Sequence, residues 1–220
     1  MAEGGRDAII FLDKNRFFVY DGNDILRVDI PETIIRDVDV VDKSGFDSLV
    51  DNFIKTKKLD PAQIWLILAD GVCFNKDIIQ TDPIQVESEI RDFLDAVPFD
   101  QILSKRYKAD KGVRIITSNL EYIEAVIEIF ARNEFVVVGV VPSAIFPVFN
   151  TKKILDTDFA KNILENKSLM RSGNMLARVN LPVSPTGNPE PKKKSKLLPF
   201  LIGGFVLLLT ILIIVIVSRG

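Results

Sequence analysis

The sequence predicts a mixed α/β domain followed by one membrane-spanning helix near the C-terminal end of the chain. Three short apolar runs separated by turn residues open the chain, and further strand-like runs then alternate with helix-like ones. Residues 197–218 are uncharged and almost wholly apolar, which is long enough to span a bilayer core of about 30 Å. We therefore divide the chain into a domain at residues 7–150, a linker at 151–196 that could hold a short helix, and a transmembrane helix at 197–218.

The first strands are predicted to form a three-stranded meander. Residues 8–12 and 17–20 are apolar and flank a short polar turn, which is the pattern of a β-hairpin. A second turn at residues 21–24 contains Gly and Asn, which tolerate positive φ, and a third strand at 25–30 follows it. Pro31 ends that strand.

A helix and a buried strand are predicted next. Ser44 and Asp47 have the spacing of a capping box at a helix N-terminus. A stripe of apolar residues at helical spacing continues from there, namely Phe46, Leu49, Val50, Phe53 and Ile54. Residues 63–69 are apolar almost throughout, so we expect a strand that is covered on both faces.

The remaining elements alternate between helix and strand. A second helix is predicted around residues 86–97 and a fifth strand at 112–117. Ser118 and Glu121 form a second capping box that opens a third helix, and a sixth strand at 135–141 follows. The predicted order is βββαβ(β)αβαβ, a meander that leads into crossover units.

The composition gives little support to catalysis. The chain contains no histidine, which removes histidine general bases and nearly all catalytic zinc sites. Cys73 is the single cysteine and is expected to be a small buried hydrophobic residue. No glycine-rich phosphate-binding motif occurs. We expect no enzyme activity, no catalytic residue, no cofactor and no metal.

The distribution of charge indicates a membrane partner. The net charge is −2, which offers no case for nucleic acid binding. The basic cluster of Lys192, Lys193, Lys194 and Lys196 precedes the apolar run, and Arg219 follows it. This asymmetry predicts that the four lysines lie at the membrane surface and that the N-terminal side is cytoplasmic. The first apolar run is too short for a signal peptide, so we expect a single-pass protein of the inner membrane, with its bulk inside the cell.

The order of several segments resembles a known family. These segments are residues 28–31, 64–74, 97–100 and 135–142. They resemble the first half of the actin-like PilM family and the cytoplasmic domain of the GspL family, which are inner-membrane assembly-platform proteins of type IV pili and type II secretion. The resemblance covers about residues 7–148. It implies a partial actin-like (ribonuclease H-like) fold and a scaffolding role.

Two places in the sequence bear on what this resemblance implies. PilM-like proteins open with an Asp-x-Gly turn that holds nucleotide phosphates, whereas residues 13–16 here contain no glycine. The segment from Arg178 resembles the Asn-Leu-Pro peptide by which PilN, a single-span protein, docks into PilM. On that resemblance the partner-binding residues are Val179, Asn180, Leu181 and Pro182. The alternative is a disordered linker in which the match arose by chance.

We therefore expect a non-catalytic, tail-anchored cytoplasmic scaffold of a pilus or secretion platform. Its role would be to recruit a cytoplasmic protein, such as the assembly ATPase, to the inner membrane, and it could also self-associate. Two other functions stay open. One is an actin-like nucleotide-binding ATPase with a degenerate phosphate turn, and the other is a membrane adaptor unrelated to pili.

Overall fold

The computed structural model describes residues 6–79, 82–147 and 155–177, all within the first of two units of the chain, Met1–Arg178. The predicted transmembrane helix at 197–218, the four lysines before it and the predicted docking residues 179–182 lie outside the described residues. Within the described ranges, no helix is long and apolar enough to cross a membrane.

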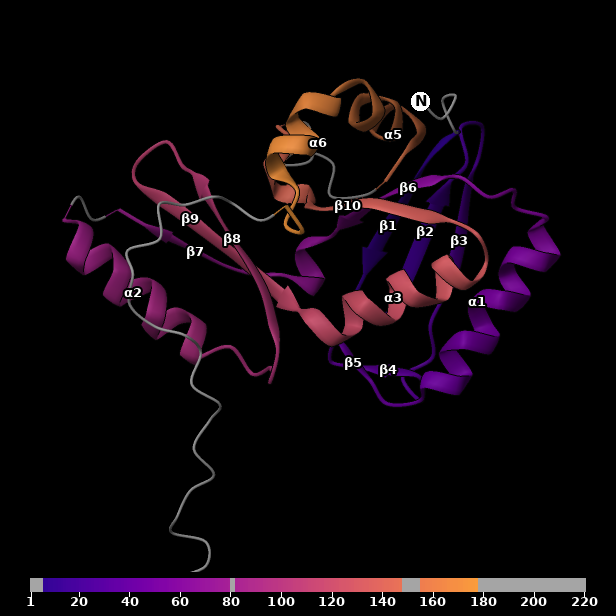
Figure 1. Cartoon of the computed structure of the whole chain (residues 1–220), viewed down its shortest axis with the longest axis horizontal. Coiled ribbons are helices and arrows are strands. Elements are labelled where there is room, and N and C mark those ends of the chain that lie inside the picture. The colour runs from indigo at the N-terminus through magenta and orange to yellow at the C-terminus, as the bar shows by residue number, and fades with distance from the viewer. Residues whose placement is uncertain (1–5, 80–81, 148–154, 178–220) are drawn as a thin grey trace, which may run out of the picture. The chain divides into compact units, whose positions relative to one another are not determined.

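A five-stranded sheet forms the centre of the unit, in the order β10-β6-β1-β2-β3 (Figure 1). Strands β1 (Asp7–Asp13), β2 (Arg16–Tyr20) and β3 (Ile25–Asp29) are antiparallel neighbours, which confirms the predicted meander. Strand β6 (Gln63–Leu68) pairs in parallel with β1, and β10 (Val136–Pro142) pairs in parallel with β6. The mixed α/β class predicted from the sequence is therefore confirmed.

Helices bury both faces of this sheet. Helices α1 (Lys43–Lys57) and α3 (Leu120–Arg132) share one apolar cluster with Ile10, Ile64 and other residues of one face. The opposite face packs against α5 (Thr157–Glu165) and α6 (Lys167–Gly173), as Figure 1 shows. Strand β6, which the sequence predicted at residues 63–69, is therefore covered on both faces as expected, since every residue from Ile64 to Leu68 is buried.

The second helical layer corrects the predicted domain boundary. Residues 151–196 were expected to form a linker that could hold a short helix, and the domain was expected to end at residue 150. In the structure, Phe159, Ile163 and Met170 are fully buried against the sheet. The folded unit therefore includes both α5 and α6, and its described part continues to Ala177.

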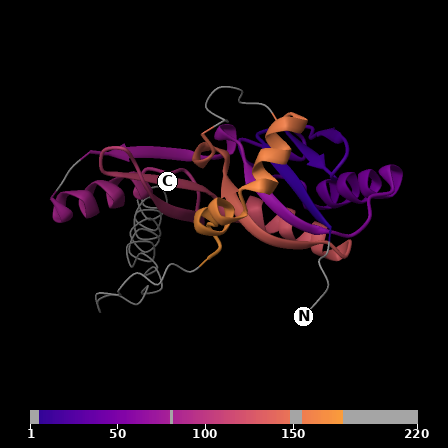
Figure 2. The ribbon, with the colours of Figure 1, turned by 90° about the horizontal axis from the view of Figure 1, so that it is seen from above.

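A smaller antiparallel sheet, β7-β9-β8, is inserted between β6 and α3 and lies to one side of the five-stranded sheet (Figure 2). Its strands are β7 (Phe74–Ile78), β8 (Ile102–Lys108) and β9 (Val113–Asn119). Helix α2 (Pro83–Asp95) covers one of its faces around Ile78, Ile90 and Ile115. Strand β9 and helix α2 were predicted, whereas β8 was not.

Short elements complete the unit. The 3-10 helix η1 (Asp70–Val72) follows β6, and η2 (Ser143–Ile145) follows β10. Strands β4 (Ile35–Arg36) and β5 (Asp39–Val40) form a small hairpin before α1.

Both predicted capping boxes are displaced from the observed helix starts. Asp42 caps α1, because its carboxylate accepts a hydrogen bond from the Gly45 backbone N–H at 2.9 Å. Asn119 caps α3 in the same way, and the Ser118 hydroxyl instead donates to the Val72 carbonyl at 2.6 Å. In both places an Asx side chain precedes the helix and takes the capping position from the serine.

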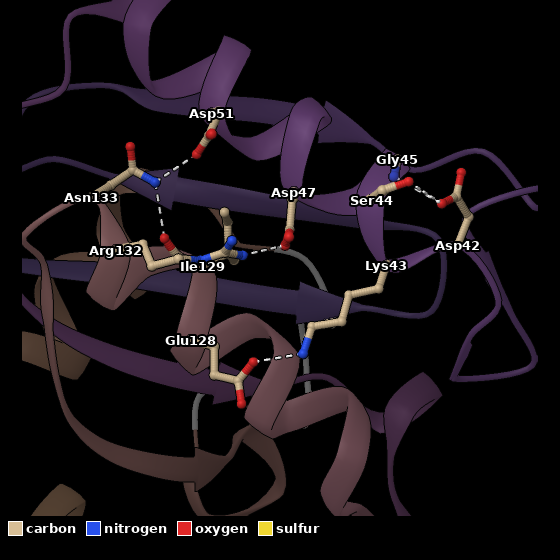
Figure 3. A network of polar contacts seen from close by, with 10 residues as sticks. All are labelled: Asp42, Lys43, Ser44, Gly45, Asp47, Asp51, Glu128, Ile129, Arg132 and Asn133. Atoms are coloured by element: carbon tan, nitrogen blue, oxygen red, sulfur yellow. Dashed lines mark hydrogen bonds and ion pairs between the residues drawn. The ribbon is translucent and has the colours of Figure 1, made fainter.

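Helices α1 and α3 are joined on their exposed sides by a polar network (Figure 3). Its contacts across the two helices are Lys43 with Glu128 at 2.7 Å, Arg132 with Asp47 at 2.5 Å, and Asn133 with Asp51 at 2.7 Å. The hydrogen bond to Glu128 also raises the pKa of Lys43. Because exposed ion pairs contribute little free energy, we expect this network to add little to the stability of the two helices.

Candidate functional site

Ligands of open sheets that contain parallel strands bind beyond the carboxyl ends of those strands. In this protein Asp13 ends β1, Asp70 and Gly71 follow β6, and Ser143 follows β10. A pocket of about 540 Å³ lies at this edge, next to the turn between β1 and β2. This edge is the first candidate site, and it is where the sequence resemblance would place nucleotide phosphates.

The charged groups of the β1–β2 turn are paired with one another. The Asp13 carboxylate accepts a hydrogen bond from the Lys14 backbone N–H at 2.8 Å and forms an ion pair with Arg16 at 3.2 Å. The Lys14 ammonium lies 2.9 Å from the Asp37 carboxylate, in the β4–β5 hairpin. A Cβ atom on Gly71 would lie 2.8 Å from the Asp13 carboxylate. The Asp13 carboxylate thus occupies the space beside the backbone of Gly71, at the end of β6. A phosphate that binds at this edge would have to approach the same backbone.

The hairpin beside this turn is held in an unusual conformation. Asp37 and Val38 both have positive φ, at 49° and 69°, which is strained for a β-branched residue such as valine. The buried Asn119 amide donates to the Val38 carbonyl at 3.0 Å and to the Asp39 carboxylate at 2.7 Å. Asn119 therefore caps α3 and fixes this hairpin at the same time. From the sequence alone, Asn119 is only an inner position of the predicted capping box of Ser118 and Glu121.

A second candidate site is a groove of about 600 Å³ between the three-stranded sheet and α6. Lys105, Tyr107 and Arg114 line its β-sheet side, and Ile145, Leu169 and Gly173 line the other. The Arg114 guanidinium is bound to the Asp77 carboxylate at 2.5 Å, which holds the pKa of that carboxyl below its usual range. The groove combines a basic wall with an apolar one, a combination suited to an extended peptide.

Two residues of β8 bind backbone carbonyls at the C-terminal end of α6 and of Asn174, which follows it. The Lys105 ammonium donates to the carbonyls of Ser172 at 2.6 Å and Asn174 at 2.8 Å. The Tyr107 hydroxyl donates to the Gly173 carbonyl at 2.8 Å. Burial lowers the pKa of Lys105 and raises that of Tyr107. Sequence analysis did not identify either residue.

Cys73 and the acidic residues are the other candidates for chemistry among the described residues. Burial, with the negative charge of Asp70 nearby, raises the pKa of the Cys73 thiol, which disfavours the nucleophilic thiolate. No group of three or more metal-binding side chains occurs among the described residues.

The predicted docking residues 179–182 and the four lysines of the predicted membrane surface lie outside the described residues. The described chain ends at Ala177, a few residues after Gly173, which lines the groove.

No protein-family model matches the chain, and no curated protein matches it. Among solved structures, the chain is similar to a PilM-PilN type IV pilus biogenesis complex, with 10% identity and a TM-score of 0.45 over 64% of this chain and 48% of that chain. It is also similar to the cytoplasmic domain of EpsL, an inner membrane component of the type II secretion system of Vibrio cholerae. In that case the identity is 12% and the TM-score 0.39, over 63% of this chain and 58% of that chain. The chain thus spans about half the length of the solved structures that it matches.

Proposed function

We propose that this chain is a non-catalytic scaffold that holds a protein partner at the cytoplasmic face of the inner membrane. The role would be that of PilM- and GspL-like proteins in the assembly platforms of type IV pili and type II secretion. The observation that carries the proposal is the β1–β2 turn, where ion pairs of Asp13 and Lys14 replace a glycine-containing phosphate turn. The meander followed by parallel strands also agrees with the fold that the sequence resemblance implies.

Nucleotide turnover separates the scaffold from the alternative, an actin-like ATPase. We expect the purified full-length chain to show no steady ATP hydrolysis, because the turn keeps its charges paired internally. Weak anion binding by Lys14 and Arg16 is compatible with a scaffold, since both are cations at the pocket. ATP hydrolysis that is lost in Asp13→Ala but kept in Asp110→Ala, an exposed control, would establish the ATPase instead.

The membrane attachment is tested by labelling single cysteines from outside the cell. The proposal places residues 197–218 across the inner membrane and Lys192, Lys193, Lys194 and Lys196 at its cytoplasmic surface. In a Cys73→Ser background, a cysteine at position 220 should react with an impermeant reagent and one at position 184 should not. The opposite pattern would overturn the cytoplasmic assignment.

We further propose that residues 179–182 dock as an extended peptide in the groove beside β8. The described chain ends a few residues after Ser172 and Gly173, which line that groove. Leu181 would enter the apolar wall, Asn180 would bond backbone groups, and Pro182 would reduce the entropy lost on ordering.

The docking proposal is tested by comparing a chain that ends at Arg178 with one that ends at Pro191. The longer chain should have a higher melting temperature or self-associate, and amide exchange at Val179 to Leu181 should be protected. Leu181→Ala should abolish the difference and Val183→Ala, one position beyond the motif, should keep it. If the two chains behave alike and the amides exchange freely, the segment is only a tether.

A membrane adaptor unrelated to pili is the remaining alternative. Affinity capture of the full-length chain from its native membrane separates the two scaffolding roles. Specific recovery of a secretion ATPase or a polytopic platform protein favours the pilus or secretion role. Recovery of neither, with another partner captured specifically, favours the unrelated adaptor.

A further inference from the structure

The C-terminal end of α6 and the two residues after it are bonded to both sheets. On the side of the three-stranded sheet, Lys105 and Tyr107 donate three hydrogen bonds to the consecutive carbonyls of Ser172, Gly173 and Asn174. Each carbonyl of this segment thus receives a side-chain donor from β8. Lys105 donates hydrogen bonds to the carbonyls of both neighbours of Gly173, Ser172 and Asn174, so one ammonium group holds the segment at two positions.

The same segment is bonded to the edge of the five-stranded sheet. The Met175 backbone N–H donates to the Val140 carbonyl at 2.7 Å, and the Val140 N–H donates to the Asn174 side-chain oxygen at 3.0 Å. The Met175 side chain is buried in the core between the sheet and helices α1 and α3. The fit is close, since a Cβ atom on Gly139 would lie 2.5 Å from the Trp65 ring and 3.0 Å from the Asn174 amide carbon.

The covalent connections between the two sheets are at one end of the three-stranded sheet. Strand β7 starts at Phe74, soon after η1, and β9 runs directly into α3 at Asn119. Phe74 pairs with Thr117, so these two connections lie side by side. Lys105 pairs with Ile116, the residue next to Thr117, and Tyr107 pairs with Arg114, two residues further along the sheet. The bonds from β8 to residues 172–174 therefore extend from near the connected end to a point farther along. A sheet connected at one end and bonded farther along has the parts of a hinge and a latch.

We propose that residues 172–175 are a latch that fixes the orientation of the three-stranded sheet against the five-stranded sheet, and that Lys105 and Tyr107 close it. Because Ser172 and Gly173 line the groove beside β8, opening the latch changes the shape of that groove. The latch does not depend on the proposed function, because it rests on contacts within the folded unit.

The test uses the full-length chain in detergent micelles and the variant Lys105→Met, which keeps the length of the side chain and removes its donors. The matched control is Lys108→Met, on the same strand and lining the same groove, with no hydrogen bond to the latch among the described contacts. The first measurement is hydrogen exchange at the Val140 and Met175 amides. The second is the distance distribution between spin labels at Asn52 on α1 and Ser88 on α2, in a Cys73→Ser background.

We expect Lys105→Met to speed exchange at both amides by about 10-fold or more, because the Ser172 and Asn174 carbonyls lose their shared charged donor. It should also broaden the distance distribution, whereas Lys108→Met should change neither measurement. Tyr107→Phe removes one hydroxyl and keeps the ring, so it should have a smaller effect in the same direction. This milder variant keeps the test informative if Lys105→Met does not fold. The latch would be overturned if exchange is unchanged in both Lys105→Met and Tyr107→Phe. It would also be overturned if exchange is faster in these variants while the distance distribution is unchanged.

Discussion

The two sheets of this protein are stabilised in different ways. The five-stranded sheet is buried on both faces, and its aromatic residues pack edge to face, as Phe17 does with Phe53 and Phe130. The three-stranded sheet has a small core on one face, and its surface carries ion pairs between neighbouring elements. These are Arg106 with Glu87, Arg114 with Asp77, and Lys76 with Glu89.

This difference indicates which part of the molecule is rigid and which can move. Apolar burial supplies most of the stability of a domain, whereas exposed ion pairs supply little. We therefore expect the five-stranded sheet to unfold only with the whole unit. The three-stranded sheet should open at a lower free energy, and the bonds of Lys105 and Tyr107 on β8 to the latch should limit that opening. The groove beside β8 therefore has one wall, that of Lys105, Tyr107 and Arg114, on the sheet that we expect to be the more mobile.

The largest effect should come from truncating the aromatic core of the five-stranded sheet. Phe17 is 1% exposed and contacts two other phenylalanine rings. Phe17→Ala should lower the free energy of global unfolding by about 3–5 kcal/mol, through lost transfer energy and the cavity left behind. Urea unfolding followed by circular dichroism measures this change. A loss below about 1 kcal/mol would mean that the aromatic core of the five-stranded sheet is not a main source of the stability of the unit.

A smaller and local effect is expected in the core of the three-stranded sheet. Ile90 on α2 is buried against Ile78 and Ile115. Ile90→Ala should cost about 2 kcal/mol, near the lower end for this substitution, because so small a core can relax around the gap. Hydrogen exchange should speed up in β7 and β9 and stay unchanged in β1 and β6. Equal acceleration in both sheets would show that they open as one unit, and would contradict the expectation that the three-stranded sheet opens at a lower free energy.

The sequence was most informative where burial leaves a regular pattern. The strands of the five-stranded sheet were predicted because each is a short apolar run between turn residues, as at residues 8–12 and 17–20. The continuous apolar run of β6 also predicted cover on both faces, which α3 and α6 with their neighbours provide. These features depend on local composition, which a single sequence displays.

The elements that were missed are short or carry a weak apolar signal. Strand β8 alternates half-buried and exposed residues and carries Lys105 and Arg106, so its apolar signal is weak. Helices α5 and α6 bury Phe159, Ile163 and Met170, but each is so short that the sequence predicted at most one short helix between residues 151 and 196, and only the tertiary fold shows that these side chains face the sheet.

The candidate site was predicted in part. The absence of glycine at residues 13–16 was visible in the sequence, but the ion pair of Lys14 with Asp37 was not. Lys105 and Tyr107 bind backbone carbonyls that lie 66 to 69 residues away in the sequence. A backbone carbonyl has no residue-type signature, so no motif could have revealed these contacts. The alternation of Leu103, Lys105 and Tyr107 on one face of β8 is the signal that was available.

The smallest effect should appear as a difference in pH dependence between the two sheets. Hydrogen bonds from Arg114 hold the pKa of Asp77 below its ordinary value of 3.8, and those from Arg106 hold the pKa of Glu87 below 4.5. A carboxyl with a lowered pKa in the folded state contributes stability that is complete above its unfolded pKa. That stability is lost as the pH falls through the folded pKa. The contribution is therefore complete at pH 6 and declines below about pH 4.5.

Both carboxylates are well exposed, so each pair should contribute less than about 1 kcal/mol, and salt should reduce it. We expect exchange in β7 and β9, corrected for its intrinsic pH dependence, to accelerate between pH 5 and pH 3 more than exchange in β1 and β6. The double variant Asp77→Asn with Glu87→Gln should remove this excess acceleration, because neither amide titrates in that range. Should the excess persist in the double variant, other carboxylates control the opening of the small sheet, and its surface ion pairs would not be what distinguishes it from the five-stranded sheet.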